Sequence, residues 1–271
     1  MCGLATEGEQ RSGHVFALLV VGCGIFGLLI GSFLNVVIYR VPRNESVISP
    51  PSACPYCGTT ILRRDNVPVL SWLILRGKCR TCEHAIPVRY PAIESVTGIL
   101  FAGAALRLHF DWALPAFLFF VAGLIALSWI DVEHLVLPKR LVYAHLAGVG
   151  LLLLLAAALT HDWRQLLVSV ACSAGWWFLF FILNLINPRW LGFGDVRFAL
   201  VLGLSLGWLG VGHVILGFFT ANLVGAVVGL VLISTGRIER SRRIPYGVFL
   251  STGALVALYF GSLLLGPFNV A

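Results

Sequence analysis

Charged residues are scarce in this chain. Only 11% of its 271 residues are charged, 59% are hydrophobic, and the mean hydropathy is +0.93. Soluble globular domains typically carry about 25% charged residues. The composition therefore excludes a water-soluble globule and predicts an all-α polytopic membrane protein, with the lipid bilayer as its surroundings.

Eight long apolar stretches are separated by short polar segments. Each approaches the roughly 20 residues with which a helix crosses about 30 Å of hydrocarbon. The first stretch is too long for the apolar region of a cleavable signal, so we expect it to remain in the mature chain. The sequence predicts about eight transmembrane helices, of which the second and sixth are the shortest, at about 15–39, 92–108, 113–130, 141–160, 165–186, 196–209, 211–234 and 246–266.

Lysine and arginine are distributed unevenly between the loops. Positive flanking residues are retained on the cytoplasmic side during membrane insertion. An eight-span topology with both termini outside places sixteen of the nineteen basic residues inside and three outside. The net charge of +7 then reflects the membrane topology. We expect the basic residues to contact anionic lipid head groups, and we expect no nucleic-acid partner. We expect a multi-pass protein of the bacterial inner membrane.

The first apolar stretch places small residues on one helical face. Gly24, Gly27, Gly31 and Asn35 share that face. Small residues let helices approach closely within a membrane. We interpret this face as a helix-packing surface, with substrate contact as the less favoured alternative.

Carboxylates are especially scarce beside the apolar stretches, and two of them, Asp131 and Asp195, fall at the ends of such stretches. An ionisable group kept beside hydrocarbon is a functional-site hypothesis, because its burial costs free energy. In the predicted topology both acids lie at the cytoplasmic membrane boundary. Gly192 and Gly194 would let backbone and substrate approach Asp195 closely, and Pro138 ends the helix of Asp131.

Two carboxyl groups a few ångströms apart cannot both ionise cheaply, so such a pair shares a proton. In amide hydrolysis the ionised partner takes a proton from water, while the protonated partner donates to the carbonyl oxygen. The sequence therefore predicts an aspartic peptidase without a covalent intermediate, with Asp131 and Asp195 catalytic and its active site facing the cytoplasm. A structural alternative stays open, in which each acid is a solvated helix-end residue and Asp195 caps a helix. Glu133 is a rival for the first position, but two residues along a helix turn it to another face.

The large cytoplasmic loop contains two Cys-x-x-Cys pairs, Cys54 with Cys57 and Cys79 with Cys82. Four thiolates in two close pairs match the tetrahedral coordination of Zn²⁺ in zinc ribbons. The loop is too short and polar to build much core of its own, so a structural metal could supply its folding energy. Redox pairs are the weaker reading, because stable disulfides are rare in the cytosol.

Several motifs together resemble the bacterial type IV prepilin peptidase family, also called leader peptidase/N-methyltransferases, which are aspartic peptidases of the Gly-x-Gly-Asp type. The resemblance runs from about Gly31 to Gly247. It rests on the order and spacing of the segments 31–40, 66–73, 76–80, 89–91, 129–138, 192–196 and 244–247, together with the two cysteine pairs.

The resemblance implies a bifunctional enzyme. Such an enzyme removes the short basic leader of type IV prepilins or pseudopilins at the cytoplasmic face, and then methylates the new N-terminus with S-adenosylmethionine. The catalytic aspartates of the family carry over onto Asp131 and Asp195. Its methyltransferase-associated acid matches Asp65, where glutamate is more usual, and its Gly-Lys pair matches Gly77 and Lys78.

The chain divides by these motifs into an N-terminal segment with the first helix at 1–40, a zinc-ribbon-like cytoplasmic loop at 41–91, and a transmembrane peptidase domain at 92–271. Three rival functions stay open. A transporter should show ionisable residues or broken helices near mid-membrane, whereas the acids of this chain sit at the edges. A presenilin-like intramembrane protease also uses Gly-x-Gly-Asp, but its Tyr-Asp and Pro-Ala-Leu signatures are missing from this sequence. A non-catalytic zinc-stabilised membrane scaffold would tolerate loss of either aspartate.

Overall fold

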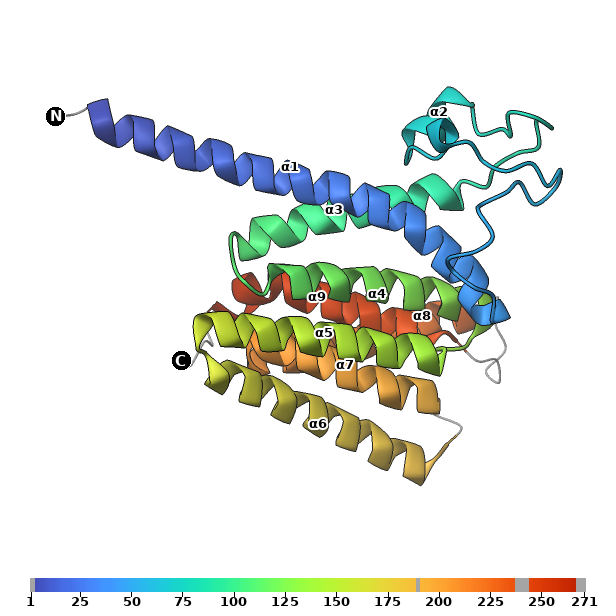
Figure 1. The fold of residues 1–271 in the computed structure, drawn as a ribbon. Coiled ribbons are helices and arrows are strands. Elements are labelled where there is room, and N and C mark those ends of the chain that lie inside the picture. Colours follow the sequence, from blue (N-terminus) through green and yellow to red (C-terminus); the bar gives the residue numbers. More distant parts are fainter. Residues whose placement is uncertain (1–2, 189–190, 237–243, 267–271) are drawn as a thin grey trace. The chain divides into compact units, whose positions relative to one another are not determined.

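The computed structural model describes residues 3–188, 191–236 and 244–266, with side chains from residue 13 onward. Within these ranges the chain is helical and forms no named strand (Figure 1). It divides into two compact units, Met1–Leu114 and Pro115–Ala271. The long helices are α1 (Gly3–Arg40), α3 (Arg89–Leu108), α4 (Leu114–His134), α5 (Lys139–Thr160), α6 (Trp163–Ile186), α7 (Phe193–Leu209), α8 (Val211–Ser234) and α9 (Tyr246–Leu265).

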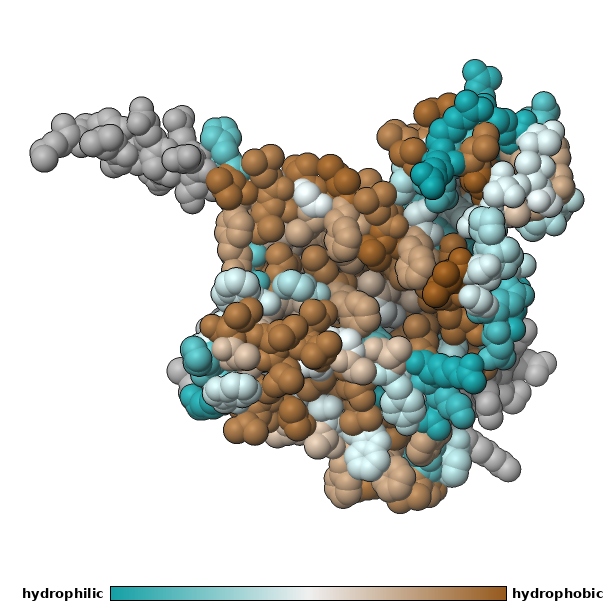
Figure 2. Space-filling model, in the orientation of Figure 1, coloured by the Kyte–Doolittle hydropathy of each residue, from teal (hydrophilic) through white to brown (hydrophobic). Residues whose placement is uncertain are grey.

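Seven of the described helices are long and apolar enough to cross a membrane, namely all of these except α7. The sixth predicted span, at 196–209, corresponds to α7, whose 17 residues stand at the short end of the roughly 17–25 residues that spanning helices use. Apolar side chains cover the helices, while polar ones gather over the loop and at helix ends (Figure 2). The structure thus confirms the predicted all-α polytopic fold.

In unit 1, α1 and α3 pack against each other through the predicted small-residue face. A Cβ atom added at Gly27 would lie 2.7 Å from the carbonyl oxygen of Thr97, and one at Gly31 would lie 2.6 Å from the Cα of Glu94. Asn35, on the same face, is buried and donates from Nδ2 to the carbonyl oxygen of Tyr90 at 3.2 Å. The interpretation of this face as a helix-packing surface is confirmed.

The loop between α1 and α3 contains two short 3₁₀ turns, η1 (Val41–Arg43) and η2 (Arg63–Asp65), and the helix α2 (Leu70–Ile74). Arg40 at the end of α1 donates to the carbonyl oxygens of Ser46 and Pro50 at 2.9 and 2.7 Å, which fixes the first part of the loop. Glu94, buried on α3, accepts a hydrogen bond from the Val69 N–H at 2.7 Å. That contact fixes the start of α2 on the helix pair.

In unit 2, glycines bring helices together in pairs. On α7, a Cβ atom at Gly203 would lie 2.6 Å from the Cα of Ser173, so the backbones of α6 and α7 nearly touch. The Ser173 hydroxyl donates to the carbonyl oxygen of Leu200 at 2.8 Å across this interface. On α9, a Cβ atom at Gly253 would lie 2.7 Å from the backbone nitrogen of Ala221 on α8. Helix α7 packs on α6, and α9 packs on α8, as expected for small-residue interfaces in membranes.

Candidate active site and metal centre

Asp131 lies in the last turn of α4 and is buried, with 6% of its surface exposed. Its Oδ2 accepts a hydrogen bond of 2.8 Å from the backbone N–H of Gly247, and the N–H of Val248 is a second donor. Both donors belong to the first turn of α9, where N–H groups have no partner within the helix. A Cβ atom at Gly247 would lie 2.8 Å from Oδ2 itself, so a side chain there would displace the Asp131 carboxylate from this position.

Asp195 is the third residue of α7 and is half-buried. Its Oδ2 accepts a hydrogen bond of 3.2 Å from the backbone N–H of Gly192, so the side chain turns back over the start of its own helix. This is the capping contact that the structural alternative predicted. Capping uses one carboxylate oxygen, and it does not exclude a chemical role for this acid.

The segments that carry the two aspartates converge in unit 2. Leu137, just beyond the end of α4, contacts both of the other segments: an added Cβ would lie 3.1 Å from Leu137 at Gly194 and 3.3 Å from it at Gly247. The structure therefore brings the two predicted catalytic acids to one place, from helices that are far apart in the sequence.

The carboxylate of each aspartate lies at the N-terminus of a helix. That of Asp131, a residue of α4, lies at the start of α9, and that of Asp195 lies at the start of its own helix, α7. The free N–H groups and the helix dipole favour negative charge there. Repulsion between two neighbouring carboxylates disfavours a doubly charged pair. This arrangement therefore favours a single negative charge shared by the two acids.

Glu133, the rival acid near Asp131, lies outside the dyad. Glu133 is exposed and accepts a hydrogen bond from the Trp129 indole at 2.9 Å, which agrees with its predicted position on another face. Sequence reasoning did not assign a role to Leu137 or Gly247. Both residues belong to recognisable motifs, Leu137-Pro138 and Pro245-Tyr246-Gly247. Neither motif indicates which residues its members contact in the folded protein.

In unit 1, the four predicted zinc ligands Cys54, Cys57, Cys79 and Cys82 form one cluster. Their sulfur atoms all lie within 4.8 Å of one another, and the Sγ atoms of Cys54 and Cys82 are 3.8 Å apart. A tetrahedral site with Zn–S bonds of about 2.3 Å has an edge of about 3.8 Å. Hydrogen bonds with Thr59 lower the pKa of the Cys57 thiol to about 6, towards the thiolate that binds metal. The donor set and its spacing fit a zinc ion.

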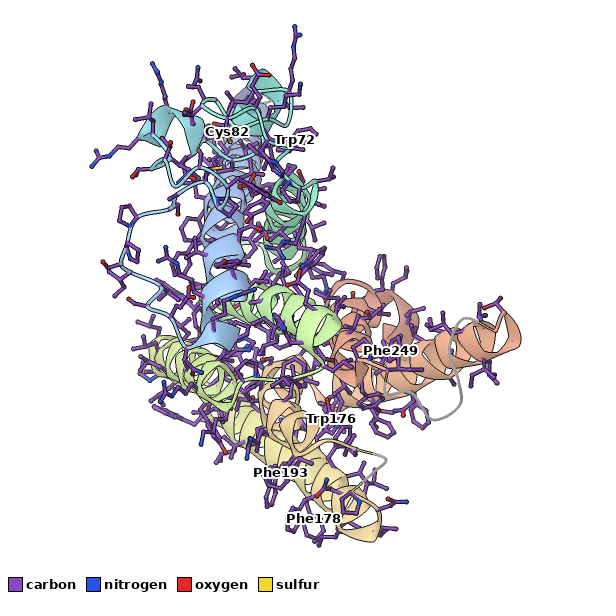
Figure 3. The ribbon with its side chains drawn as sticks, turned by 90° about the vertical axis from the view of Figure 1, so that its right-hand side faces the viewer. Trp72, Cys82, Trp176, Phe178, Phe193 and Phe249 are labelled. Carbon is purple, nitrogen blue, oxygen red and sulfur yellow. The ribbon has the colours of Figure 1, made fainter. Side chains whose placement is uncertain are left out.

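The two cysteine pairs lie in turns of the same design. In each turn the first cysteine donates its N–H to the carbonyl oxygen five residues on, at 2.9 Å in both cases, and its carbonyl oxygen accepts from the N–H four residues on. An isolated antiparallel bridge closes each turn, Ala53 with Thr60 and Lys78 with Ala85. Cys82 and the nearby Trp72 are labelled in Figure 3. The loop thus contains a structural repeat that the sequence analysis did not identify.

The three residues that the resemblance links to methyl transfer lie in this loop. Asp65 receives both hydrogen bonds of the Arg80 guanidinium, at 2.8 and 2.6 Å, and this cation holds the pKa of the Asp65 carboxyl below its usual range. Gly77 has a φ of +68° and is buried under the Trp72 ring, which a Cβ atom would approach to 2.9 Å. Lys78 is exposed. Asp65 and Gly77 thus have contacts that shape the loop.

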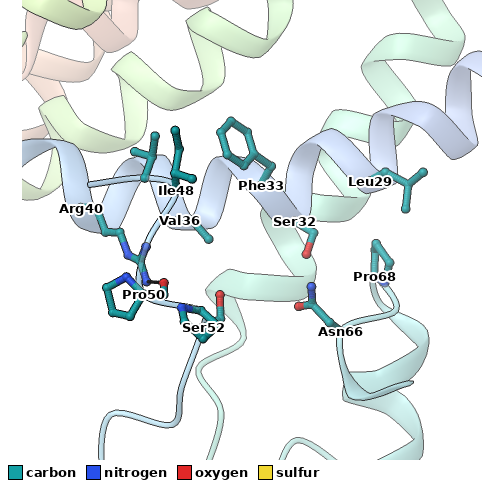
Figure 4. Close-up of a pocket in the computed structure, with 12 residues that line it drawn as sticks. Leu29, Ser32, Phe33, Val36, Arg40, Ile48, Pro50, Ser52, Asn66 and Pro68 are labelled. Carbon is teal, nitrogen blue, oxygen red and sulfur yellow. Dashed lines mark hydrogen bonds between the residues drawn. The ribbon is translucent and has the colours of Figure 1, made fainter. Parts of the chain in front are cut away.

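A cleft of about 300 Å³ lies between the second half of α1 and the loop, with Leu29, Phe33 and Val36 on its apolar side. Ser32 of α1 and Asn66 of the loop face one another across it (Figure 4). The residues that line it do not include Asp65, Gly77 or Lys78. This cleft and the predicted methyl-transfer residues are therefore separate features of unit 1.

Comparisons with known proteins agree with this arrangement. The family model for the bacterial Peptidase A24 N-terminal domain matches residues 25–108, and that for the type IV leader peptidase family matches residues 118–230. No solved structure matches the chain.

Curated relatives cover nearly the whole chain. A prepilin leader peptidase/N-methyltransferase of Aeromonas hydrophila is 34% identical over 262 residues, which are 88% of this chain and 89% of that protein. One of Bacillus subtilis is 32% identical, over 88% of this chain and 92% of its own length. One of Myxococcus xanthus is 38% identical, over 83% and 67% respectively. With its dyad, its cysteine cluster and these matches, the chain belongs to the type IV leader peptidase family.

Proposed function

We propose that this protein is a membrane-embedded aspartic endopeptidase that removes the leader of type IV prepilins or pseudopilins, with Asp131 and Asp195 as its catalytic residues. The observation that carries the proposal is that the segments of both acids meet at Leu137, where Asp131 accepts the hydrogen bond from Gly247. Family membership supports the substrate class, since the relatives are named for prepilin cleavage and N-methylation.

The dyad can hydrolyse a peptide bond without a covalent intermediate. The ionised aspartate accepts a proton from water as the water oxygen bonds to the scissile carbonyl carbon, and the protonated aspartate donates to the carbonyl oxygen. When the carbon–nitrogen bond breaks, the aspartate that took the proton from water donates it to the leaving amine, and the other aspartate takes back a proton from the gem-diol hydroxyl, which restores the dyad. The backbone N–H donors from Gly247 and Gly192 hold the two carboxylates in place during these transfers.

The reaction takes place at the cytoplasmic face in this proposal. Asp131 ends α4, Asp195 begins α7 and Gly247 begins α9, so the dyad lies at one end of the helices of unit 2. Lys139 and Arg197 follow within a few residues of the same helix ends, and basic residues are retained on the cytoplasmic side. A prepilin presents its basic leader to the same side of the membrane.

N-methylation is the second proposed activity, and S-adenosylmethionine supplies the methyl group. Asp65, Gly77 and Lys78 remain its candidate residues, and the loop at 41–91 that contains them is the proposed zinc-binding module, distinct from the peptidase domain at 92–271. The cysteine ligands Cys54, Cys57, Cys79 and Cys82 hold this loop in shape around Zn²⁺. Cleavage frees the amine that is methylated, so the two activities follow one another on a single substrate.

The proposal is tested by coexpression with a type IV prepilin and mass measurement of the mature N-terminus. Asp131→Asn and Asp195→Asn should each lower cleavage by at least about 1,000-fold, because neither partner can replace the proton transfers of the other. Loss of the leader together with one added methyl group reports both activities, and loss of the leader alone reports cleavage only.

Glu133→Gln provides the matched control, because Glu133 is an acid two residues from Asp131 on the exposed side of α4. It should cleave at the wild-type rate. Full cleavage by either dyad variant would reject the catalytic pair and favour the zinc-stabilised scaffold. Cleavage of membrane proteins other than prepilins, with prepilins left intact, would favour a presenilin-like protease.

A further inference from the structure

Glu94 is a carboxyl group that the proposed mechanism does not use. It lies on α3, a helix long and apolar enough to cross a membrane, and it is 8% exposed. An acid kept within such a helix is a functional-site hypothesis, because its burial costs free energy. A Cβ atom added at Gly31 of α1 would lie 2.6 Å from the Cα of Glu94. The close packing of α1 on α3 therefore fixes the point from which this side chain extends.

The Glu94 carboxylate connects the two helices to the loop. Its Oε2 accepts the hydrogen bond from the Val69 N–H at 2.7 Å, and the Ser32 hydroxyl of α1 is a second donor. Asn66 and Pro68, just before Val69, line the cleft of unit 1 on the side opposite Ser32 (Figure 4). This wall of the cleft is thus attached to α3 through one carboxylate.

Val69 has a backbone conformation that needs a constraint from outside. Its φ is +60° and its ψ is −50°, and positive φ is a genuine outlier for a β-branched residue. Such strain persists only where the surrounding structure over-determines it. Val69 precedes the first residue of α2 and makes no side-chain capping hydrogen bond there. The hydrogen bond to Glu94 supplies a constraint at the strained residue itself.

The constraint continues from Val69 to Asp65, the candidate methyl-transfer acid. Ser71 of α2 is buried, and its hydroxyl accepts from the Val67 N–H at 3.0 Å and donates to the carbonyl oxygen of Arg64 at 3.1 Å. These bonds close the chain from Arg64 to Ser71 into one turn, and both Asp65 and Val69 lie within it. A shift of Val69 away from α3 would therefore displace the backbone of Asp65.

The position of Asp65 relative to the bilayer bears on methylation. In the proposed function the dyad, at the ends of membrane helices, releases the amine that is then methylated, so the bilayer sets the starting depth of that amine. A misplacement of about 1 Å can cost about 100-fold in rate. Because α1 and α3 are candidate membrane spans, the bond from Glu94 to the loop holds the turn of Asp65 at a fixed depth.

We propose that Glu94 is a positioning residue for N-methylation, which holds Asp65 in place through Val69. The proposal rests on the proposed methyltransferase activity and adds to it a residue outside the loop. Well-packed apolar residues can replace buried charged groups at little cost in stability. The contribution of Glu94 is therefore an acceptor at a fixed position, which packing alone does not supply.

Methyl transfer from labelled S-adenosylmethionine to a purified prepilin tests this role, with leader removal and bound zinc measured on the same protein. Glu94→Leu removes the acceptor and should lower the rate of methylation about tenfold, as far as loss of Asp65 itself does, with cleavage and zinc content unchanged. Glu94→Gln keeps an oxygen that can accept the Val69 N–H, and should lose no more than about threefold.

Thr97→Val is the matched control for these variants. Thr97 is fully buried one turn along α3, and its hydroxyl donates to the carbonyl oxygen of Ile93 in the same helix. The substitution removes a buried hydrogen bond without touching the loop. Its rates of cleavage and methylation should equal those of the wild type.

Double variants separate positioning from general destabilisation. If Glu94 acts through Asp65, the protein with both Glu94→Leu and Asp65→Asn should methylate about as fast as Asp65→Asn alone, because the residue to be positioned is already lost. Ser71→Ala opens the same turn and gives an independent second variant. Its loss of methylation should likewise disappear in the Asp65→Asn background.

Wild-type methylation by Glu94→Leu, losses that multiply in the double variant, or a parallel loss of bound zinc would overturn the proposal while leaving the methyltransferase in place. If Glu94→Leu does not fold, Ser71→Ala with its double variant decides by the same criteria. Failure of the wild type to methylate cleaved prepilin would instead reject the proposed second activity. Normal methylation by Asp65→Asn would reject the role of Asp65, and this proposal with it.

Discussion

The cysteine loop of unit 1 and the helices of unit 2 reach defined structures by opposite means. In the loop, hydrogen bonds join residues four or five positions apart, the pattern occurs twice, and the four cysteine sulfurs of the two turns cluster together. In unit 2, Asp131 meets Gly247 across 116 positions, and close approach depends on glycines such as Gly203. In our proposal zinc coordination stabilises the loop, whereas close packing of helix surfaces stabilises unit 2.

The largest effect should come from removing the metal. Cys57→Ser should reduce bound zinc to near zero and make the loop at 41–91 sensitive to protease, because structural zinc contributes about 10–16 kcal/mol to small domains. The helices of unit 2 should remain folded. Metal analysis, limited proteolysis and circular dichroism measure these outcomes.

Cys23→Ser is the control for that experiment, because Cys23 is a buried cysteine of α1 outside the cluster. It should leave zinc content unchanged. If the loop stays protected from protease in metal-free wild-type protein, the prediction that zinc stabilises this loop is wrong.

The next effect concerns helix surfaces. Gly203→Leu should destabilise unit 2 by about 3 kcal/mol or more, because its side chain would be forced into the backbone of α6. Gly175→Leu, a glycine-to-leucine change at an open position of α6, should leave the unfolding temperature nearly unchanged. Thermal unfolding in detergent provides the measurement, and equal stability of the two variants would show that these interfaces are not tightly packed.

A smaller effect is expected at Gly77. Gly77→Ala combines a left-handed backbone with a clash against Trp72, and should cost about 2 kcal/mol, whereas Gly58→Ala, with a similar φ of +70° and open space, should cost about 1 kcal/mol. In competition with a chelator these costs correspond to about 30-fold and 5-fold weaker zinc retention. If Gly77→Ala abolished methylation with zinc retention unchanged, Gly77 would act on the methyl donor instead.

The smallest effect on stability is expected for Asp65→Asn. Its ion pair with Arg80 is near the surface, where such pairs contribute little, so zinc retention should change less than about threefold. Because Arg80 keeps the pKa of Asp65 low, the substitution removes a negative charge at neutral pH. We expect leader removal to be unchanged and the methylated fraction to fall about tenfold, as measured by intact mass. Asp65→Glu should restore methylation, and normal methylation in Asp65→Asn would leave the acid a structural role only.

The difference between the regions also explains what could be predicted from the sequence. Apolar stretches specify helices locally, so the expected span at 211–234 coincides with α8, and that at 141–160 falls within α5. Cysteine spacing is likewise local, and it predicted the sulfur cluster. Glu94 was not singled out, because one acid within an apolar stretch does not indicate that its partner is the distant Val69 N–H.

The predicted topology placed Asp131 and Asp195 at the same membrane boundary, but it could not show that they meet. Their separation along the chain does not determine whether α4, α7 and α9 converge, since that depends on backbones that approach within van der Waals contact. The role of Leu137 shows the same limit: its contacts with Gly194 and Gly247 follow from tertiary packing and have no counterpart in local sequence pattern.

The hydrogen bond that Asp131 receives comes from the main chain of Gly247. Side-chain replacements elsewhere on α9 therefore cannot delete this donor, and only proline at 247 would remove the hydrogen itself. Replacements elsewhere on α9 can disturb its packing on α8, as at Gly253, but the main-chain donor to Asp131 stays in place. At position 247 itself, a side chain would occupy the space of the Asp131 carboxylate.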